Sequence, residues 1–201
     1  MKQLIKRAVK SFSRNLVALT GRSKVGRYLL DQIVNNTMGQ TVEVRHQGIE
    51  LVFSCPNSLN RWRATTFSTK EPESLEWIDS LEEGAVFWDI GANVGLYSIY
   101  AAKRKKCRVY AFEPSVFNLE LLARNVWLNG LTDLITLIPL PLTESLSANK
   151  LNMSSMDWGG ALSTFGAEFG HDGKPLGKLF EFRTLGISMQ DAVGMLGIPR
   201  P

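Results

Sequence analysis

The sequence lacks the features of a membrane-spanning, disulfide-bonded or zinc-binding protein. It has no run of about 18 apolar residues, the length a helix needs to cross a bilayer. Its 201 residues include two cysteines, Cys55 and Cys107, and two histidines, His46 and His171. These four residues lie far apart, without the spacing of metal ligands or of a redox pair. We therefore expect a metal-free protein of the reducing cytoplasm.

Acidic residues are missing from the first 30 positions. This segment carries eight basic side chains, whereas the whole chain has 23 basic and 19 acidic residues. The eight are Lys2, Lys6, Arg7, Lys10, Arg14, Arg22, Lys24 and Arg27. The rest of the chain is therefore net acidic, which argues against an enzyme with a basic face for nucleic acid.

Apolar residues recur at helical spacing within the same basic segment. They are Leu4, Ile5, Ala8, Val9, Phe12, Leu16 and Leu19. This spacing predicts an amphipathic helix over residues 3–20, in a basic helical head of residues 1–40. Three interpretations stay open: a helix packed on the outside of the domain, a weak membrane-surface contact through residues 1–30, and a cleaved targeting segment. The short apolar stretch at 16–19 disfavours a secretory signal.

A β-hairpin and a helix are predicted in residues 41–84. Residues 42–46 and 49–53 alternate apolar and polar side chains on either side of Gln47-Gly48, which is typical of a hairpin. Residues 56–70 read as irregular, with Trp62 and Phe67 as packing anchors. Pro72 in an acidic first turn predicts a helix over 71–81.

From residue 85 onward, strands and helices alternate. Strands are predicted at 85–90, 108–112 and 134–138, and helices at 96–105 and 116–129. The first strand is a continuous apolar run, as expected for a buried parallel strand. The pattern predicts an α/β fold with a doubly wound, Rossmann-like sheet in residues 85–201. Trp77 and Trp127 are expected to be packing anchors, and Cys107 to be a core or edge residue.

The last third of the chain is less regular in pattern. Residues 143–179 are rich in Ser, Gly and Asn and are expected to have little regular structure, followed by a strand at 180–187 and a helix at 188–196. The loop Asp157–Ala161 reads as a flexible surface loop, or as one that approaches a ligand through its paired glycines. Only three core strands are predicted, so we expect an incomplete sheet in a truncated chain, with the apolar run 86–88 at an open edge.

The turn between the first strand and the first helix of this region is a candidate ligand site. Gly91 and Gly95 permit a tight turn and a close approach to a ligand, at a helix end with unpaired N–H groups. Asp89 closes the strand just before them. A carboxylate there suits the cationic amino group of S-adenosylmethionine better than a pyrophosphate.

A second acid strengthens this interpretation. Glu113 ends the next predicted strand, 24 residues after Asp89. In a βαβ unit, such an acid can accept hydrogen bonds from both ribose hydroxyls. Nicotinamide cofactors share this acid, but their Gly-x-Gly-x-x-Gly fingerprint fails at Asn93, so S-adenosylmethionine is favoured.

The two motifs Asp89-Ile90-Gly91-Ala92-Asn93-Val94-Gly95 and Phe112-Glu113-Pro114 resemble those of the FkbM family of methyltransferases. The resemblance covers roughly residues 65–201. It implies that Asp89, Gly91, Ala92, Asn93 and Gly95 bind the methionine end of the cofactor and that Glu113 binds the ribose. Asn118 and Asn125 also look like family positions, although ordinary polar helix residues are an equal alternative. Ser188-Met189-Gln190-Asp191 resembles a family helix start, but the Ile-Lys-Ile-Asp strand that normally follows is not present.

These motifs predict transfer of a methyl group from S-adenosyl-L-methionine. The resemblance implies a hydroxyl acceptor on a small molecule or a glycan, with no nucleic acid partner. No catalytic base can be named, and His171 is a weak candidate. Two alternatives remain: a non-catalytic remnant, and a membrane-surface-associated protein in which the basic head dominates.

Overall fold

The computed structural model describes residues 2–170 and 173–201. His171, the weak candidate for a catalytic base, and Asp172 lie outside the described residues. The chain divides into two units, residues 1–40 and residues 41–201.

Two helices, α1 (Lys2–Thr20) and α2 (Lys24–Met38), make up the first unit. The predicted N-terminal helix is confirmed, and the second one was not predicted as a separate element. The side chain of Ser23 caps α2 by accepting a hydrogen bond from the backbone N–H of Gly26. A Cβ atom on Gly26 would lie 1.8 Å from the carbonyl oxygen of Thr20, so the turn between the helices requires glycine there.

The second unit begins with the predicted hairpin. Strands β1 (Thr41–His46) and β2 (Ile49–Ser54) pair in antiparallel register. The segment expected to be irregular instead forms α3 (Ser58–Thr65) and α4 (Phe67–Lys70), and this expectation was wrong. The Asn57 side chain caps α3 by accepting from the backbone N–H of Asn60, a signal that apolar periodicity does not reveal.

The central sheet is parallel and has the order β3-β4-β5. Its strands are β3 (Val86–Ile90), β4 (Arg108–Phe112) and β5 (Ile135–Ile138). The helices around it are α5 (Pro72–Ser80), α6 (Leu96–Lys105) and α7 (Val116–Leu128). Each of these elements was predicted to within two residues, because buried parallel strands and amphipathic helices give strong periodic patterns.

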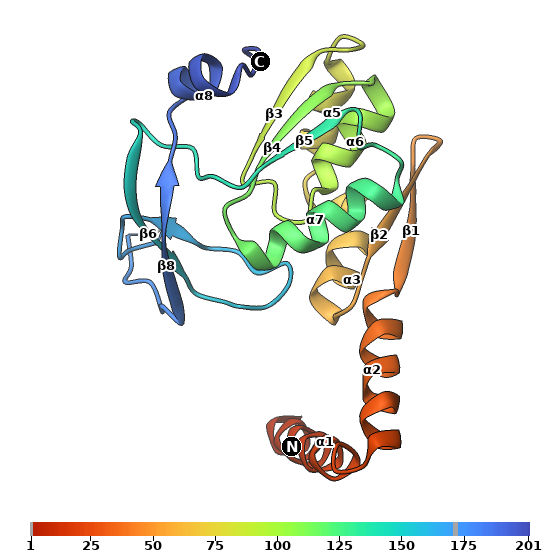
Figure 1. Ribbon diagram of the computed structural model, residues 1–201. Coiled ribbons are helices and arrows are strands. Elements are labelled where there is room, and N and C mark those ends of the chain that lie inside the picture. The colour runs from red at the N-terminus through yellow and green to blue at the C-terminus, as the bar shows by residue number, and fades with distance from the viewer. Residues whose placement is uncertain (1, 171–172) are drawn as a thin grey trace. The chain divides into compact units, whose positions relative to one another are not determined.

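Helices cover both faces of the central sheet. Phe87, Val109 and Ile135 belong to a hydrophobic cluster that includes residues of α6 and α7. Their neighbours Trp88 and Phe112 face the opposite side, in a second cluster with residues of α8 (Met189–Leu196). Figure 1 shows α8 on one side of the strands and α6 on the other. This arrangement is the predicted Rossmann-like α/β fold.

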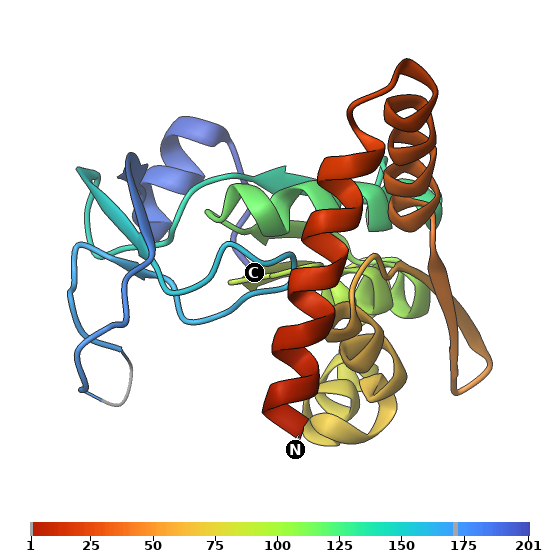
Figure 2. The same ribbon diagram turned by 90° about the horizontal axis from the view of Figure 1, so that it is seen from below.

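A second, antiparallel sheet lies beside the central one. It consists of β6 (Ser147–Met153), β7 (Thr164–Phe165) and β8 (Phe180–Gly186), in the order β7-β6-β8. Strand β8 confirms the strand predicted at 180–187, but β6 and β7 lie in the stretch expected to have little regular structure. The segment between β6 and β7, light blue in Figures 1 and 2, leaves this sheet and reaches back toward the central one.

The expected packing anchors are partly wrong. Phe67 is buried, but Trp62, Trp77 and Trp127 are 48%, 57% and 72% exposed. Large aromatic side chains at the core are instead Tyr100, Phe53 and Phe112. Cys55 and Cys107 are both buried as free thiols.

Candidate functional site

The turn from β3 to α6 lies where the central strands end. Gly91 and Gly95 have φ angles of 80° and 82°, and Asn93 between them has 52°. The backbone N–H groups of Gly91 and Ala92 both donate to the carbonyl of Phe112 at the end of β4. The two parallel strands therefore hold the turn rigidly, and glycine supplies the left-handed conformation at low cost.

Gly95 has a packing role in addition to its backbone angle. A Cβ atom at this position would lie 2.2 Å from Cδ1 of Leu122 on α7. Gly95 was predicted to line the ligand site. In the structure it brings the start of α6 close to α7, and residues 91–93 form the lining.

Asp89 lies on β3, two residues before the turn. The Ser98 hydroxyl, on the first part of α6, donates a 2.5 Å hydrogen bond to its Oδ2. Burial raises the pKa of Asp89 above 3.8, while the hydrogen bonds from the hydroxyl and backbone of Ser98 oppose this shift. The carboxylate is therefore fixed in orientation at the site.

Glu113 follows β4 and is almost fully buried, with 5% exposure. Its Oε1 accepts from the backbone N–H of Ser115 and its Oε2 from that of Asn93, both at 2.8 Å. Burial raises its pKa, and these hydrogen bonds oppose the rise. The Asn118 side chain also donates to this carboxylate. An ionised carboxylate offers about four acceptor positions, so capacity remains for a further donor.

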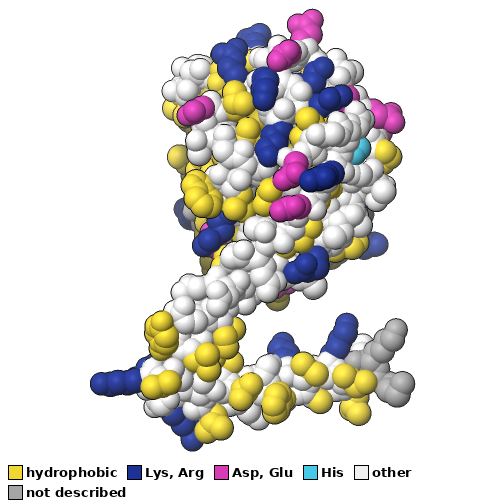
Figure 3. Space-filling model, turned by 90° about the vertical axis from the view of Figure 1, so that its right-hand side faces the viewer, with side chains coloured by type: hydrophobic (Ala, Val, Ile, Leu, Met, Phe, Trp, Pro, Cys, Tyr) yellow, Lys and Arg dark blue, Asp and Glu magenta, His cyan; other side chains and the backbone are white. Residues whose placement is uncertain are grey.

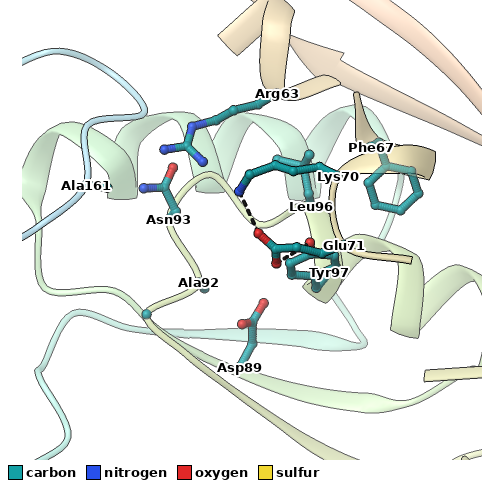
Figure 4. Close-up of a pocket in the computed structure, with 11 residues that line it drawn as sticks. Arg63, Phe67, Lys70, Glu71, Asp89, Ala92, Asn93, Leu96, Tyr97 and Ala161 are labelled. Carbon is teal, nitrogen blue, oxygen red and sulfur yellow. Dashed lines mark hydrogen bonds and ion pairs between the residues drawn. The ribbon is translucent and has the colours of Figure 1, made fainter. Parts of the chain in front are cut away.

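A cavity of about 250 Å³ opens between the turn and the α3–α5 region. Side chains of both charges line it, as Figure 4 shows: Arg63, Lys70 and Glu71 lie across from Asp89 and Asn93. Lys70 pairs with Glu71 at 2.6 Å. We call this space the charged compartment.

Glu71 is held in place within the charged compartment. The Tyr97 hydroxyl donates to it at 2.7 Å. Hydrogen bonds from Lys70 and Tyr97 lower the pKa of Glu71, whereas burial and the neighbouring Glu71 raise the pKa of Tyr97. Burial also lowers the pKa of Arg63. The compartment thus offers fixed anionic and cationic groups to a ligand.

A second cavity, of about 200 Å³, adjoins the first. It is lined by Glu113 and Asn118 and shares Gly91, Asn93 and Ala161 with the charged compartment. We call it the polar compartment. Its lining offers acceptors and amide groups.

A third cavity, of about 220 Å³, continues from the second. It shares Gly91, Pro114 and Ser163 with the polar compartment. Its other walls are mainly apolar: Ile90, Phe112, Leu140, Pro141, Leu142, Leu151 and Phe165. We call it the apolar compartment. The three spaces follow one another in the order charged, polar, apolar.

The loop at Trp158–Gly160 lies over this site. The carbonyl of Gly160 accepts from the side-chain amides of Asn93 at 2.8 Å and Asn118 at 2.9 Å. Arg63 donates from Nη2 and Nε to the carbonyl of Gly159, at 2.7 and 3.1 Å. Of the two interpretations of this loop from the sequence, the structure therefore favours close approach to the site.

The structure brings most of the predicted residues together. Asp89, Gly91, Ala92 and Asn93 line the charged compartment, and Glu113 and Asn118 line the polar one. Sequence reasoning missed Arg63, Lys70, Glu71 and Tyr97, which lie outside the two motifs. The side-chain pattern of 56–70 carried no signal for Arg63 or Lys70.

Asn125 is buried away from the cavities. Its Oδ1 accepts from the backbone N–H of Ser54 at 2.7 Å, and its Nδ2 donates to the carbonyl of Val94 at 2.8 Å. It therefore joins β2 and the glycine turn through α7. Among the described residues, no group of three or more His, Cys, Asp or Glu side chains is arranged to hold a metal ion.

Comparison with known proteins gives partial structural likenesses only. No protein-family model matches the sequence, and no curated protein matches it. The M. jannaschii TYW2 structure in complex with AdoMet is 21% identical over 49% of this chain, with a TM-score of 0.36. The SAM-dependent methyltransferase from Agrobacterium tumefaciens is 18% identical over 50% of this chain, with a TM-score of 0.39. The chain spans 42% and 32% of these two proteins.

Proposed function

We propose that this chain binds S-adenosyl-L-methionine and supports transfer of its methyl group. The observation that carries the proposal is the order of the three compartments around Gly91. The cofactor has three parts in the same order: a zwitterionic amino acid, a ribose with two hydroxyls, and an adenine ring with apolar faces. Each cavity alone is smaller than the roughly 300 Å³ of small-molecule sites, so one ligand would occupy them together.

The charged compartment suits the amino acid end of the cofactor. Asp89 and Glu71 can accept from an ammonium group, and Arg63 and Lys70 can donate to a carboxylate. A compartment with groups of both signs fits a zwitterion better than it fits a purely anionic ligand. The same acids disfavour the pyrophosphate of a nicotinamide cofactor, because like charges repel.

The other two compartments suit the nucleoside. Glu113 retains acceptor capacity after its hydrogen bonds from the backbone of Ser115 and Asn93 and from the Asn118 side chain, so a ribose hydroxyl can donate to it. Pro114, Leu140 and Leu142 provide apolar walls for an adenine ring. This assignment agrees with the roles that the FkbM resemblance implies for Asp89 and Glu113.

The reaction we propose is methyl transfer to a hydroxyl of a small molecule or a glycan, as in enzymes of the FkbM family. The cofactor supplies the reactive methyl group when it is bound. The protein residues orient it and exclude water. Asp89 and Arg63 would fix its amino acid end, and the Trp158–Gly160 loop would limit access of solvent.

Calorimetric titration of the full chain with S-adenosylmethionine tests the cofactor site. The wild-type chain should bind, and Asp89→Asn should weaken binding by about tenfold to a hundredfold, because a charge-assisted hydrogen bond contributes about 1.5–3 kcal/mol. Asp133→Asn is the matched control, since Asp133 is an exposed acid. The absence of binding by the wild-type chain would overturn the proposal and favour a non-catalytic remnant.

The pH dependence of the same titration gives an independent check. Protonated Asp89 cannot attract an ammonium group, so the affinity should rise with pH as Asp89 loses its proton. Because burial raises its pKa, this rise should be centred above pH 3.8. Below the α-amino pKa of about 7.7–8.0 the amino group of the ligand keeps its positive charge. A pH profile in Asp89→Asn as steep as that of the wild type would contradict the role of Asp89.

A further inference from the structure

Helix α1 carries an apolar face that is open to solvent. At about 100° per residue, seven of its apolar residues fall within an arc of about 140°, and Val17 and Ala18 fall outside it. The seven are Leu4, Ile5, Ala8, Val9, Phe12, Leu16 and Leu19. The six larger side chains among them are between 51% and 75% exposed. We call this set the apolar arc of α1.

Basic residues occupy the opposite side of α1. Lys6, Arg7, Lys10 and Arg14 fall outside the apolar arc, and the sequence of the helix contains no acidic residue. Figure 3 shows hydrophobic side chains in a row along this unit, with Lys and Arg side chains projecting from it. The helix therefore separates apolar and cationic surfaces over its first part, up to Arg14.

Helix α2 adds further exposed apolar surface to the same unit. Val25, Leu29 and Ile33 follow one another at a spacing of four residues and are all more than half exposed. Such a spacing places them along one side of the helix. Exposed apolar surface of this extent is typical of an interaction site.

We propose that α1 binds lengthwise to the surface of membranes that contain anionic lipids, with its apolar arc inserted at the headgroup boundary. A cationic face opposite an apolar one is the pattern of helices that lie in this interface. Anionic headgroups would neutralise Lys6, Arg7, Lys10 and Arg14, which have no acidic neighbour on the helix. Among the described residues, no helix is long and apolar enough to cross a bilayer, so the contact would be peripheral.

A second copy of the chain fits this surface less well. Helices that pair through apolar faces commonly gain specificity from interhelical pairs of acidic and basic residues at the flanks. Helix α1 has no acidic residue for such pairs, so a second copy would gain no ion pair beside the apolar contact. Charge complementarity therefore favours an anionic surface.

Sedimentation of the full chain with vesicles tests the proposal. Vesicles of phosphatidylcholine with about a third phosphatidylserine should bind the chain, and vesicles of phosphatidylcholine alone should bind it at least about tenfold more weakly. Raising NaCl from about 0.1 to 0.5 M should weaken binding to the anionic vesicles, because salt screens exposed charges. Equal binding to both kinds of vesicle would overturn the proposed attraction between α1 and anionic lipids.

Two matched variants test the apolar arc. Phe12→Ser should lower the affinity for anionic vesicles about tenfold, because it removes a large inserted side chain. Val17→Ser should change it less than about twofold, since Val17 is also exposed, at 52%, but lies outside the arc. Circular dichroism would show that both variants fold.

Equal effects of the two substitutions would overturn the proposed orientation of α1. A lipid-free dimer seen by analytical ultracentrifugation, and lost in Phe12→Ser, would instead assign the arc to a second copy. Loss of vesicle binding is also distinct from loss of cofactor binding, which depends on residues of the other unit.

Discussion

At the scale of single residues, Arg63 has two possible roles in ligand binding, and an experiment has to distinguish them. It holds the carbonyl of Gly159 through two hydrogen bonds, and it lines the charged compartment. A guanidinium group can serve both purposes, because it has five N–H donors in a fixed plane. A substitution at this position therefore affects the loop, the ligand carboxylate or both.

A pair of ligands distinguishes these roles. Arg63→Ala should lower the affinity for S-adenosylmethionine about tenfold, in line with the loss of a charged hydrogen bond. It should lower the affinity for 5′-methylthioadenosine less, because this ligand lacks the amino acid end and would report only the effect on the loop. Calorimetry with both ligands measures the ratio of the two losses in affinity. Arg45→Ala, at an exposed arginine, serves as the control.

Equal losses for the two ligands would contradict a carboxylate contact. They would mean that Arg63 acts through the loop alone. Unchanged affinity for both ligands would exclude both roles.

The motif residues could be predicted at this scale, whereas Arg63 could not. Asp89 and Glu113 end parallel strands, and strand order alone brings such ends to one edge of a sheet. Arg63 lies on α3, 26 residues before Asp89, and reaches the site only through the packing of α3–α5. The opposite happens at Asn125. The family resemblance suggested a ligand contact there, but in the structure its side chain hydrogen-bonds to the backbone of Ser54 and Val94.

At the scale of elements, the Trp158–Gly160 loop joins parts of the chain that are far apart in sequence. Asn57 and Asn60 donate to the carbonyl of Trp158, at 3.0 and 2.8 Å. On the other side, the backbone N–H of Gly159 donates to Asn118 on α7 at 2.9 Å. The loop therefore connects α3 to α7 across the cavities. Its position depends on the close approach of its backbone to the side chains of Asn57, Asn60 and Asn118.

Gly159→Ala should disturb this loop. Gly159 has a φ of 83°, and a Cβ atom there would lie 2.5 Å from Oδ1 of Asn60. We expect the affinity for S-adenosylmethionine to fall about tenfold, because the loop would have to shift at the cavities to relieve the clash with Asn60 and a left-handed strain of about 1–2 kcal/mol. Limited chymotrypsin digestion should also cut faster at Trp158, which is a second readout of a displaced loop.

Gly84→Ala provides the control for backbone strain alone. Gly84 has a similar φ of 77°, but no atom lies within 4 Å of the position of its Cβ. Gly84→Ala should leave the affinity for S-adenosylmethionine and the rate of cleavage at Trp158 close to those of the wild type. Identical behaviour of the two variants would contradict a role of the loop in ligand binding.

Elements with buried, periodic faces were predictable, and those without them were not. Strand β6 has four exposed residues followed by three buried ones, so its sequence shows no alternation. Helix α3 has only two buried residues, Asn60 and Ala64, and so lacks an apolar stripe. Both elements depend on neighbours that come later or earlier in the chain, which a local pattern does not contain.

At the scale of the whole molecule, the two proposals belong to different units. The hydrophobic clusters and the residues packed on them come from the stretch between Val42 and Ile198. All residues that line the three compartments also lie in the second unit, between Arg63 and Phe165. The apolar arc of α1 belongs to the first. The division predicts that ligand binding and membrane binding are separable.

Deletion of residues 1–40 should therefore remove one property and keep the other. The remaining chain retains both hydrophobic clusters, so its thermal unfolding midpoint should stay within a few degrees of that of the full chain, a shift that corresponds to about 1 kcal/mol. Its affinity for S-adenosylmethionine should change less than about twofold, while sedimentation with anionic vesicles should be lost, because that contact depends on α1. Vesicle binding that survived the deletion would place the membrane contact in the second unit, and loss of cofactor binding would show that the first unit supports the site.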